Sequence, residues 1–219
     1  MNIAILLYDR FTALDAIGPY EVLSRLPGAR VSFIAGEAGP VTTDNGMLTV
    51  VAERSLADLT APDILLVPGG PGEVAARAGK PVLEWLRQAD ETSTWTTSVC
   101  TGSLILAAAG LLAGRRATSH WLALEELGRL GARPVSERIV IDGKLVTAAG
   151  VSAGIDMALS LAAVIAGEEV AQAIQLGIEY DPQPPFDAGS PQTAPAPIVE
   201  LLRRNSRFVI GEDAPAASG

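Results

Sequence analysis

The single cysteine of the chain, Cys100, is the first candidate for chemistry. It follows the β-prone run Thr94 to Val99 and precedes the small, apolar run Gly102 to Leu112, so we place it where a strand turns into a helix. Free N–H groups at a helix N-terminus stabilise a thiolate, and a thiolate is a nucleophile. A lone cysteine is otherwise a small buried hydrophobe. The strand-to-helix turn favours a nucleophile, and we expect its pKa to be lowered.

An aspartate early in the chain is the second candidate. Asp15 follows the apolar run Ile3 to Tyr8, while Gly18 and Pro19 have the residue types of a helix cap and a first helical residue. Asp15 therefore stands too early to cap the helix that we expect to begin at Pro19. Its neighbours are apolar, and burial raises the pKa of a carboxyl, which suits a proton donor. We expect Asp15 to take part in chemistry rather than to cap a helix.

A glycine-rich segment supplies backbone groups to the same region. The segment Pro68 to Gly72 reads Pro-Gly-Gly-Pro-Gly and follows the apolar run Ile64 to Val67. Gly69 and Gly70 let backbone N–H groups approach a ligand closely. Together with the N–H of Thr101, they predict a pocket for an anion or an oxyanion.

Gly150 and His120 are weaker candidates for the pocket. Gly150 follows the run Lys144 to Ala148 and opens a glycine-rich turn before a buried helix. His120 lies beside Trp121, and two interpretations stay open for it: a structural or pocket-lining histidine, and a catalytic one.

These candidates need a fold that brings their segments together. Apolar runs of four to seven residues alternate with amphipathic stretches, which predicts a doubly wound α/β domain with a mostly parallel sheet flanked by helices. In such a sheet a ligand binds beyond the carboxyl ends of the strands, and each candidate segment follows a strand. Residues 41–51 hold an Asn-Gly pair and predict a small β-hairpin attached to the main sheet. A second antiparallel pair is expected at 137–141 and 144–148, and helices at 155–165 and 168–178.

The chain changes character after Tyr180. Residues 181–191 hold four prolines and two acidic residues, so neither a helix nor a central strand can form there. A loose linker and an ordered strap across a neighbouring subunit both remain open. We therefore expect an α/β domain over residues 1–180, and over 181–219 a strap, a short helix at 197–204 and a frayed tail at 211–219.

The composition of the chain limits the kinds of molecule that we expect it to bind. A net charge of −9 argues against a nucleic-acid surface, and no apolar run reaches the length of a membrane span. One cysteine and one histidine leave no internal disulfide and no structural zinc site. The N-terminus lacks the pattern of a signal peptide, so we expect a cytoplasmic protein with a small-molecule ligand.

Several of these segments resemble the ThiJ/PfpI superfamily, and within it the isonitrile hydratase branch. The segments that carry the resemblance are Phe11 to Leu23, Pro68 to Gly70, Ser98 to Ser103, Gly110 to Trp121 and Tyr180 to Pro191. The hydratase branch has an aspartate at the position of Asp15, whereas the deglycase-like branch pairs the cysteine with a glutamate.

The resemblance implies a flavodoxin-like fold, a homodimer, and no cofactor or metal. It also implies that Cys100 attacks the terminal carbon of an isocyanide while Asp15 acts as acid and base, with Thr101 and the Gly69-Gly70 turn around the nucleophile. The expected product is an N-substituted formamide, released through a thioimidate intermediate.

Two alternatives within the superfamily stay open. A glyoxalase III or deglycase-like enzyme would use the same thiol on a dicarbonyl, with His120 or a glutamate as base. A redox sensor would oxidise Cys100 to a sulfinic acid. A protease is disfavoured because Thr101 stands where the protease-like branch has histidine.

Overall fold

Seven short strands form the central sheet of the computed structural model, which describes residues 1–206. In spatial order they are β10 (Ile139–Asp142), β11 (Leu145–Ala148), β7 (Trp95–Val99), β6 (Ile64–Val67), β1 (Asn2–Leu6), β2 (Arg30–Ala35) and β5 (Arg54–Ser55). Every neighbouring pair is parallel except β10 and β11. The doubly wound, mostly parallel sheet is therefore confirmed, together with the expected antiparallel pair.

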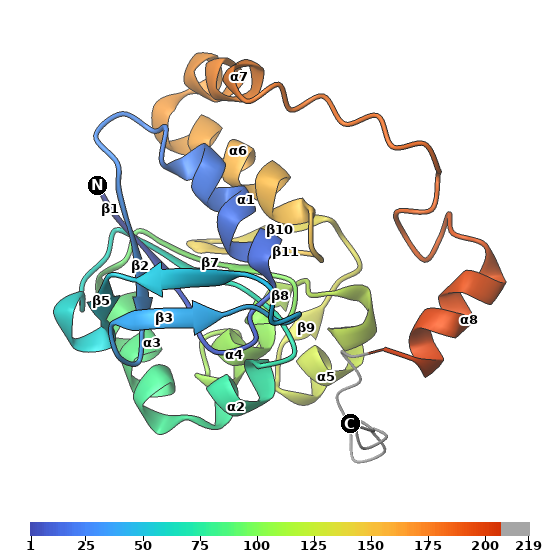
Figure 1. Ribbon diagram of the computed structural model, residues 1–219, viewed down its shortest axis with the longest axis horizontal. Coiled ribbons are helices and arrows are strands. Elements are labelled where there is room, and N and C mark those ends of the chain that lie inside the picture. Colours follow the sequence, from blue (N-terminus) through green and yellow to red (C-terminus); the bar gives the residue numbers. More distant parts are fainter. Residues whose placement is uncertain (207–219) are drawn as a thin grey trace.

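The pleat of the strands divides the core into two layers. Ile3 and Ile5 of β1 face α1 (Ala13–Leu23), α6 (Ala153–Ala166) and α7 (Glu168–Gly177), whereas Ala4 and Leu6 face the opposite layer. That layer holds α2 (Glu73–Ala78), α3 (Lys80–Thr92), α4 (Gly102–Ala108) and α5 (Leu124–Arg129). Figure 1 shows the helices on the two faces of the sheet.

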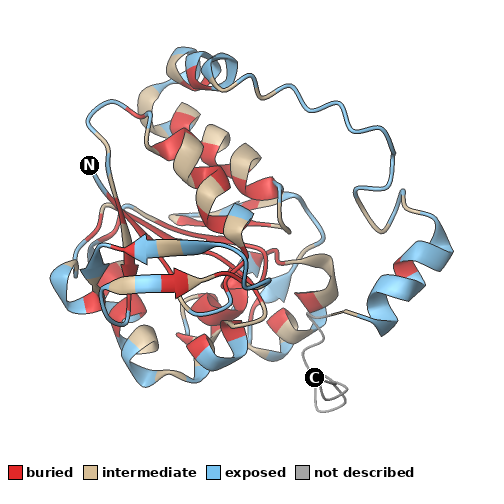
Figure 2. Cartoon of the chain, viewed as in Figure 1, coloured by how far each residue is buried: buried red, intermediate tan, exposed pale blue. Residues whose placement is uncertain are grey.

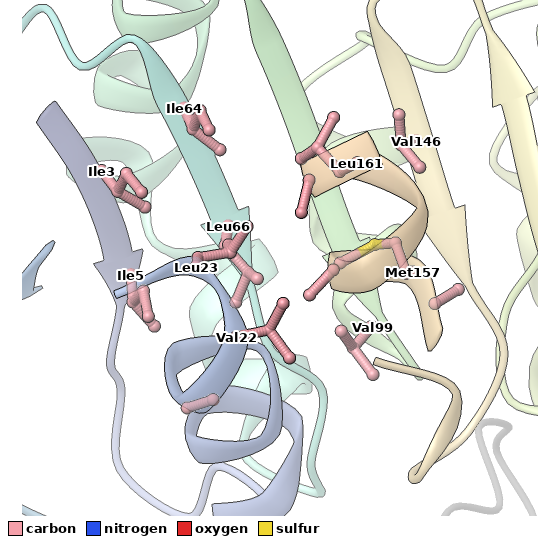
Figure 3. Packing of buried hydrophobic residues seen from close by; sticks show 14 of the residues in the cluster. Ile3, Ile5, Val22, Leu23, Ile64, Leu66, Val99, Val146, Met157 and Leu161 are labelled. Carbon is pink, nitrogen blue, oxygen red and sulfur yellow. The ribbon is translucent and has the colours of Figure 1, made fainter. Parts of the chain in front are cut away.

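Side chains from α1 and α6 fill the space over the centre of the sheet. Val22 of α1 and Met157 of α6 are fully buried, and both lie over the strand residues in Figure 3. Burial of a side chain of this size contributes roughly 1.5–3 kcal/mol relative to exposure. Because α1 carries Asp15, its packing against α6 fixes the position of the candidate acid.

The start of α1 differs from the prediction. The helix begins at Ala13, with Thr12 as its N-cap residue, so Asp15 lies in its first turn and Pro19 lies inside the helix. A proline there removes the N–H that would bond to the Asp15 carbonyl group. Packing offsets this cost, because Gly18 lies so close to α6 that an added Cβ would stand 3.0 Å from Ile155 Cγ1. The Gly-Pro pair therefore marks a close helix contact, not a helix start.

The predicted hairpin is present, but its strands lie outside the main sheet. β3 (Gly39–Thr42) and β4 (Thr49–Ala52) pair only with each other. The hairpin forms a two-stranded sheet of its own beside the main sheet, whose edge next to β2 is occupied by β5. A single backbone bond from Glu53 N–H to the Phe33 carbonyl, 3.0 Å long, ties the end of the hairpin to β2.

The remaining elements are short. They are η1 (Leu56–Asp58), η2 (Trp121–Ala123), the two-residue strands β8 (Arg116–Ala117) and β9 (Arg133–Pro134), and α8 (Ala196–Arg204). No helix within residues 1–206 combines the length and apolar character needed to cross a bilayer.

The proline-rich segment contains neither helix nor strand, as expected, and it runs from the end of α7 to α8. It is largely exposed in Figure 2, and the Phe186 side chain is 78% exposed. At its far end Val199 of α8 is buried, and the Arg203 guanidinium lies 5.6 Å from the centre of the Trp121 ring. The predicted tail at 211–219 lies outside the described residues, and the division at residue 180 stays a prediction.

Candidate active site

Cys100 stands on a strained turn between β7 and α4. Its φ of +57° is in the left-handed region, which non-glycine residues adopt only where surrounding contacts hold them. The Cys100 N–H donates to the Ala148 carbonyl at 3.0 Å. The Cys100 carbonyl accepts from the hydroxyl groups of Ser119 at 3.0 Å and Ser103 at 3.2 Å. The strand-to-helix elbow predicted from the sequence is confirmed, and backbone bonds on both sides of Cys100 fix it.

The Asp15 carboxyl is completely buried beside this elbow. Its Oδ2 accepts from the Gly69 N–H at 2.9 Å, whereas no N–H or O–H donor among residues 1–206 reaches Oδ1. Burial raises the pKa of Asp15 to about 8, against the lowering effects of the Gly69 bond and of the Cys100 thiol. Asp15 therefore holds a proton at neutral pH, and the predicted raised pKa is confirmed.

The pKa of Cys100 differs from the prediction. Burial and the negative charge of Asp15 raise it above the ordinary value of a thiol, and the N–H and hydroxyl of Thr101 oppose this only in part. The thiol is fully buried, so desolvation outweighs the stabilisation of a thiolate by Thr101, the N-cap residue of α4. The expected low pKa is wrong: the elbow aims the thiol without making it acidic. Both members of the pair are protonated near neutral pH.

Gly69 and Gly70 connect Asp15 to Thr101. A Cβ on Gly69 would lie 2.5 Å from Thr101 N and 2.9 Å from Asp15 Oδ2, so only glycine fits. The Gly70 N–H donates to Thr101 Oγ1 at 2.9 Å, and the Gly69 N–H is bonded to Asp15. The sequence predicted that the N–H groups of Gly69, Gly70 and Thr101 would face a ligand. The two glycine donors instead have acceptors within the protein, whereas the Thr101 N–H lies against the Cys100 thiol. In this state the glycines position Asp15 and Thr101.

His120 and Gly150 lie against each other. Any Cβ on Gly150 would overlap His120 Cδ2, so this close approach requires glycine. His120 Nδ1 accepts from the Leu122 N–H at 3.4 Å, and burial lowers the His120 pKa to about 4. The imidazole is thus neutral at physiological pH. Contacts join Asp15, Cys100, Thr101 and the two glycines into one group, while His120 pairs with Gly150 at its side.

A cavity of about 230 Å³ adjoins the elbow. Ser119 and Ala149 connect it to Cys100, because both line the cavity and both bond to the Cys100 backbone, Ala149 through its carbonyl at 3.2 Å. Its other walls come from η2, from α5, from the loops next to β8, β10 and β11, and from the proline-rich segment and the residue after it: Thr118, Trp121, Leu124, Ser136, Glu137, Arg138, Gly150, Gly189, Ser190, Pro191 and Gln192. The volume suits a small ligand.

Two residues of the site, Tyr8 and Ser119, were not predicted from the sequence. The Tyr8 hydroxyl donates to the Pro68 carbonyl at 2.8 Å, and burial beside Asp15 raises the Tyr8 pKa, so it remains a donor. Its position at the end of the first strand is a signal that could have revealed it. Ser119 carries no such signal, because only the fold brings its hydroxyl to Cys100. Within residues 1–206 no cluster of three His, Cys, Asp or Glu side chains could hold a metal ion.

Comparison with known proteins agrees with this fold. A model of the DJ-1/PfpI family matches residues 1–164. The chain belongs to this family. It is 43% identical to isonitrile hydratase from Pseudomonas putida over 206 residues, which cover 94% of this chain and 90% of that protein. A crystal structure of a ThiJ/PfpI family protein from Pseudomonas syringae matches with a TM-score of 0.90 and 40% identity, covering 93% of this chain and 84% of that one.

Part of this chain is also similar to part of a longer protein. The HTH-type transcriptional regulator CdhR of Pseudomonas aeruginosa is 36% identical over 165 residues, which cover 72% of this chain but only 48% of the regulator. Membership of the family is therefore compatible with more than one function.

Proposed function

We propose that this DJ-1/PfpI protein is an isonitrile hydratase that converts isocyanides into N-substituted formamides. The observation that carries the proposal is the buried pair of Cys100 and Asp15, in which the carboxyl is protonated near neutral pH and its Oδ1 has no N–H or O–H donor among the described residues. The 43% identity to isonitrile hydratase over most of both chains supports it.

The first step adds the thiol to a single carbon atom. The terminal carbon of an isocyanide accepts the Cys100 sulfur and a proton, so a C–S bond and a C–H bond form while the S–H bond breaks. Asp15 gives its proton to the carbon and receives the thiol proton, and the pair is neutral before and after the step. The product is a thioimidate, and a thiol with a raised pKa suffices because its proton leaves during the attack.

The second step returns the enzyme to its starting state. Water adds to the thioimidate carbon and gives a proton to Asp15, which passes its own proton to the nitrogen. The C–S bond then breaks, the carbonyl forms, and the hydroxyl proton returns to sulfur. One isocyanide and one water yield one formamide, and each proton is accounted for by Cys100, Asp15 and water. The cavity beside Ser119 and Gly150 would hold the nitrogen substituent.

Parallel assays test the proposal. The purified protein is mixed with p-nitrophenyl isocyanide and, separately, with methylglyoxal, and the formamide and the consumed dicarbonyl are followed by chromatography. We expect formamide production that Cys100→Ala abolishes. Consumption of methylglyoxal far faster than any isocyanide would refute the hydratase and favour the glyoxalase or deglycase alternative. Oxidation of Cys100 by peroxide with no turnover of either compound would favour a redox sensor.

We also propose a homodimer. Large apolar side chains are exposed on α6 and α7, namely Val164 at 59% and Leu176 at 79%, and the proline-rich segment adds Phe186. Contact with a second copy would bury such groups.

A further inference from the structure

The turn that leads into α1 is held from two directions. Residues 9–12 form this turn at the end of the segment that connects β1 to the helix carrying Asp15, and Arg10 takes a left-handed φ of +62°. On one side the glycine loop holds this turn: the Thr12 N–H donates to the Gly69 carbonyl at 2.8 Å, and the Gly72 N–H donates to the Arg10 carbonyl at 3.3 Å. Gly69 is also the donor to Asp15 Oδ2.

The hairpin β3–β4 holds the other side of the turn. The Arg10 N–H donates to the Thr42 carbonyl at 2.8 Å, and the Asp44 N–H donates to the Phe11 carbonyl at 2.9 Å. The Thr12 side chain completes this contact, because its Oγ1 donates to Asp44 Oδ2 at 2.9 Å. Thr12 is the N-cap residue of α1, yet its hydroxyl makes no capping bond. Its hydroxyl instead links the start of the helix to the hairpin.

We propose that Asp44 is a positioning residue for Asp15, acting through the hydrogen-bonded series Asp44, Thr12, Gly69 and Asp15. This gives a role to a hairpin whose strands take no part in the main sheet. The expected effect of Asp44 on the catalytic rate rests on the proposed function. Its effect on the position of the Asp15 carboxyl is independent of that function. Displacing a reacting group by about 1 Å can lower a rate by up to about 10²-fold.

Charge gives Asp44 a second, separable effect. The titratable groups that influence Asp15 are Cys100 and Asp44, and the Asp44 charge raises the Asp15 pKa. Burial raises the pKa of the neighbouring Tyr8, and the charges of four groups raise it further: Asp15, Glu73, Cys100 and Asp44. Removing the Asp44 charge while keeping an acceptor should therefore lower the Asp15 pKa. Removing the Thr12 hydroxyl should weaken the hydrogen bond from Gly69 to Asp15 and thereby raise the Asp15 pKa.

Four variants separate these effects. Thr12→Val removes the hydroxyl at nearly constant shape, and Thr12→Ser keeps it. Asp44→Ala removes acceptor and charge, and Asp44→Asn keeps an acceptor. Thr49→Val is the matched control, because it removes an exposed threonine hydroxyl from the same hairpin. We expect Thr12→Val and Asp44→Ala to lower kcat for isocyanide hydration about tenfold or more with KM within twofold, and Thr12→Ser and Thr49→Val to stay within twofold of the parent.

A second measurement does not depend on the substrate. The Asp15 carboxyl carbon is followed by ¹³C NMR through a pH titration, with its signal assigned by its loss in Asp15→Asn. We expect a lower midpoint in Asp44→Asn and a higher one in Thr12→Val. If no isocyanide is hydrated, the proposed function fails and the titration alone decides the positioning role. An unchanged midpoint in Thr12→Val would overturn the positioning role, because Asp44→Asn tests the charge alone, and a normal kcat in Thr12→Val and Asp44→Ala would overturn it too. Should Thr12→Val fail to fold, the midpoint in Asp44→Ala is compared with that in Asp44→Asn, because both remove the charge and only Asp44→Ala removes the acceptor. A higher midpoint in Asp44→Ala is expected, and equal midpoints would overturn the positioning role.

Discussion

Replacing Asp15 by asparagine should stabilise the protein while it inactivates the enzyme. The folded state holds Asp15 with a pKa of about 8, against 3.8 without burial. Between these values the unfolded chain releases the proton and the native state keeps it, so the native state binds more protons and its stability falls as pH rises. The contribution of Asp15 to the free energy of unfolding is fully present below pH 3.8 and is lost as the pH rises through about 8. Asparagine does not titrate, so the variant lacks this dependence of stability on pH.

The size of the effect follows from the pKa shift. Each pH unit inside the window changes the free energy of unfolding by about 1.4 kcal/mol, so from pH 5 to pH 8 the variant should gain about 4 kcal/mol relative to the parent. Glu73, whose pKa burial raises to about 7, contributes equally to both proteins and cancels in the difference. Asparagine also keeps an acceptor for the Gly69 N–H, so the local geometry is retained.

Urea unfolding of both proteins at pH 5, 6, 7 and 8 measures this difference, and isocyanide turnover is assayed on the same samples. We expect turnover to fall by about 10² or more, because asparagine cannot exchange a proton. Parallel stability curves across this pH range would refute the claim that Asp15 is buried with its proton. Normal turnover in the variant would refute its role as acid and base.

Four further outcomes are expected. Cys100→Ala should abolish isocyanide turnover and leave the urea midpoint nearly unchanged, and residual turnover near the parent rate would remove the thiol from the mechanism. Iodoacetamide should alkylate Cys100 slowly at pH 6 by mass spectrometry, since burial keeps the thiol protonated, and rapid stoichiometric reaction there would contradict the raised pKa. His120→Ala should cost far less activity than Asp15→Asn, and an inactive His120→Ala would favour the dicarbonyl enzymes. Sedimentation at micromolar concentration should show a dimer that Phe186→Ala weakens, and a monomer of the parent protein would end that proposal.

Local sequence cues were sufficient for the geometry of the nucleophile but not for its pKa. The change from a β-prone to a helical run located the Cys100 elbow, because a turn between such runs is a local property. The thiol pKa depends on burial and on Asp15, which is remote in the sequence and meets Cys100 only in the fold. For the same reason the Ser119 hydroxyl, which fixes the Cys100 carbonyl, could not be found from its neighbours.

Asp15 shows the opposite case, in which the chemistry was predicted and the local structure was not. Its apolar neighbours predicted a raised pKa, and burial is the main cause of the shift. The Gly18-Pro19 pair indicated a helix start, but close packing against α6 keeps both residues inside α1. Tertiary contacts outweigh the local preference of proline here, because the buried face of a helix contributes more than one lost backbone bond.

The neutral Cys100–Asp15 pair bears on the choice between substrates. An isocyanide takes the sulfur and the proton on the same carbon, so the thiol and the acid must reach one atom, and the contact between Cys100 and Asp15 meets that requirement. A dicarbonyl takes the sulfur on carbon and the proton on the neighbouring oxygen, and it calls for donors aimed at an oxyanion. The Gly69 and Gly70 N–H groups are bonded to Asp15 and Thr101, and they are not available for that purpose in this state. Adding both the sulfur and the proton to one carbon requires the thiol and the carboxyl to lie side by side, and it does not require a thiol of low pKa. This arrangement favours the hydratase.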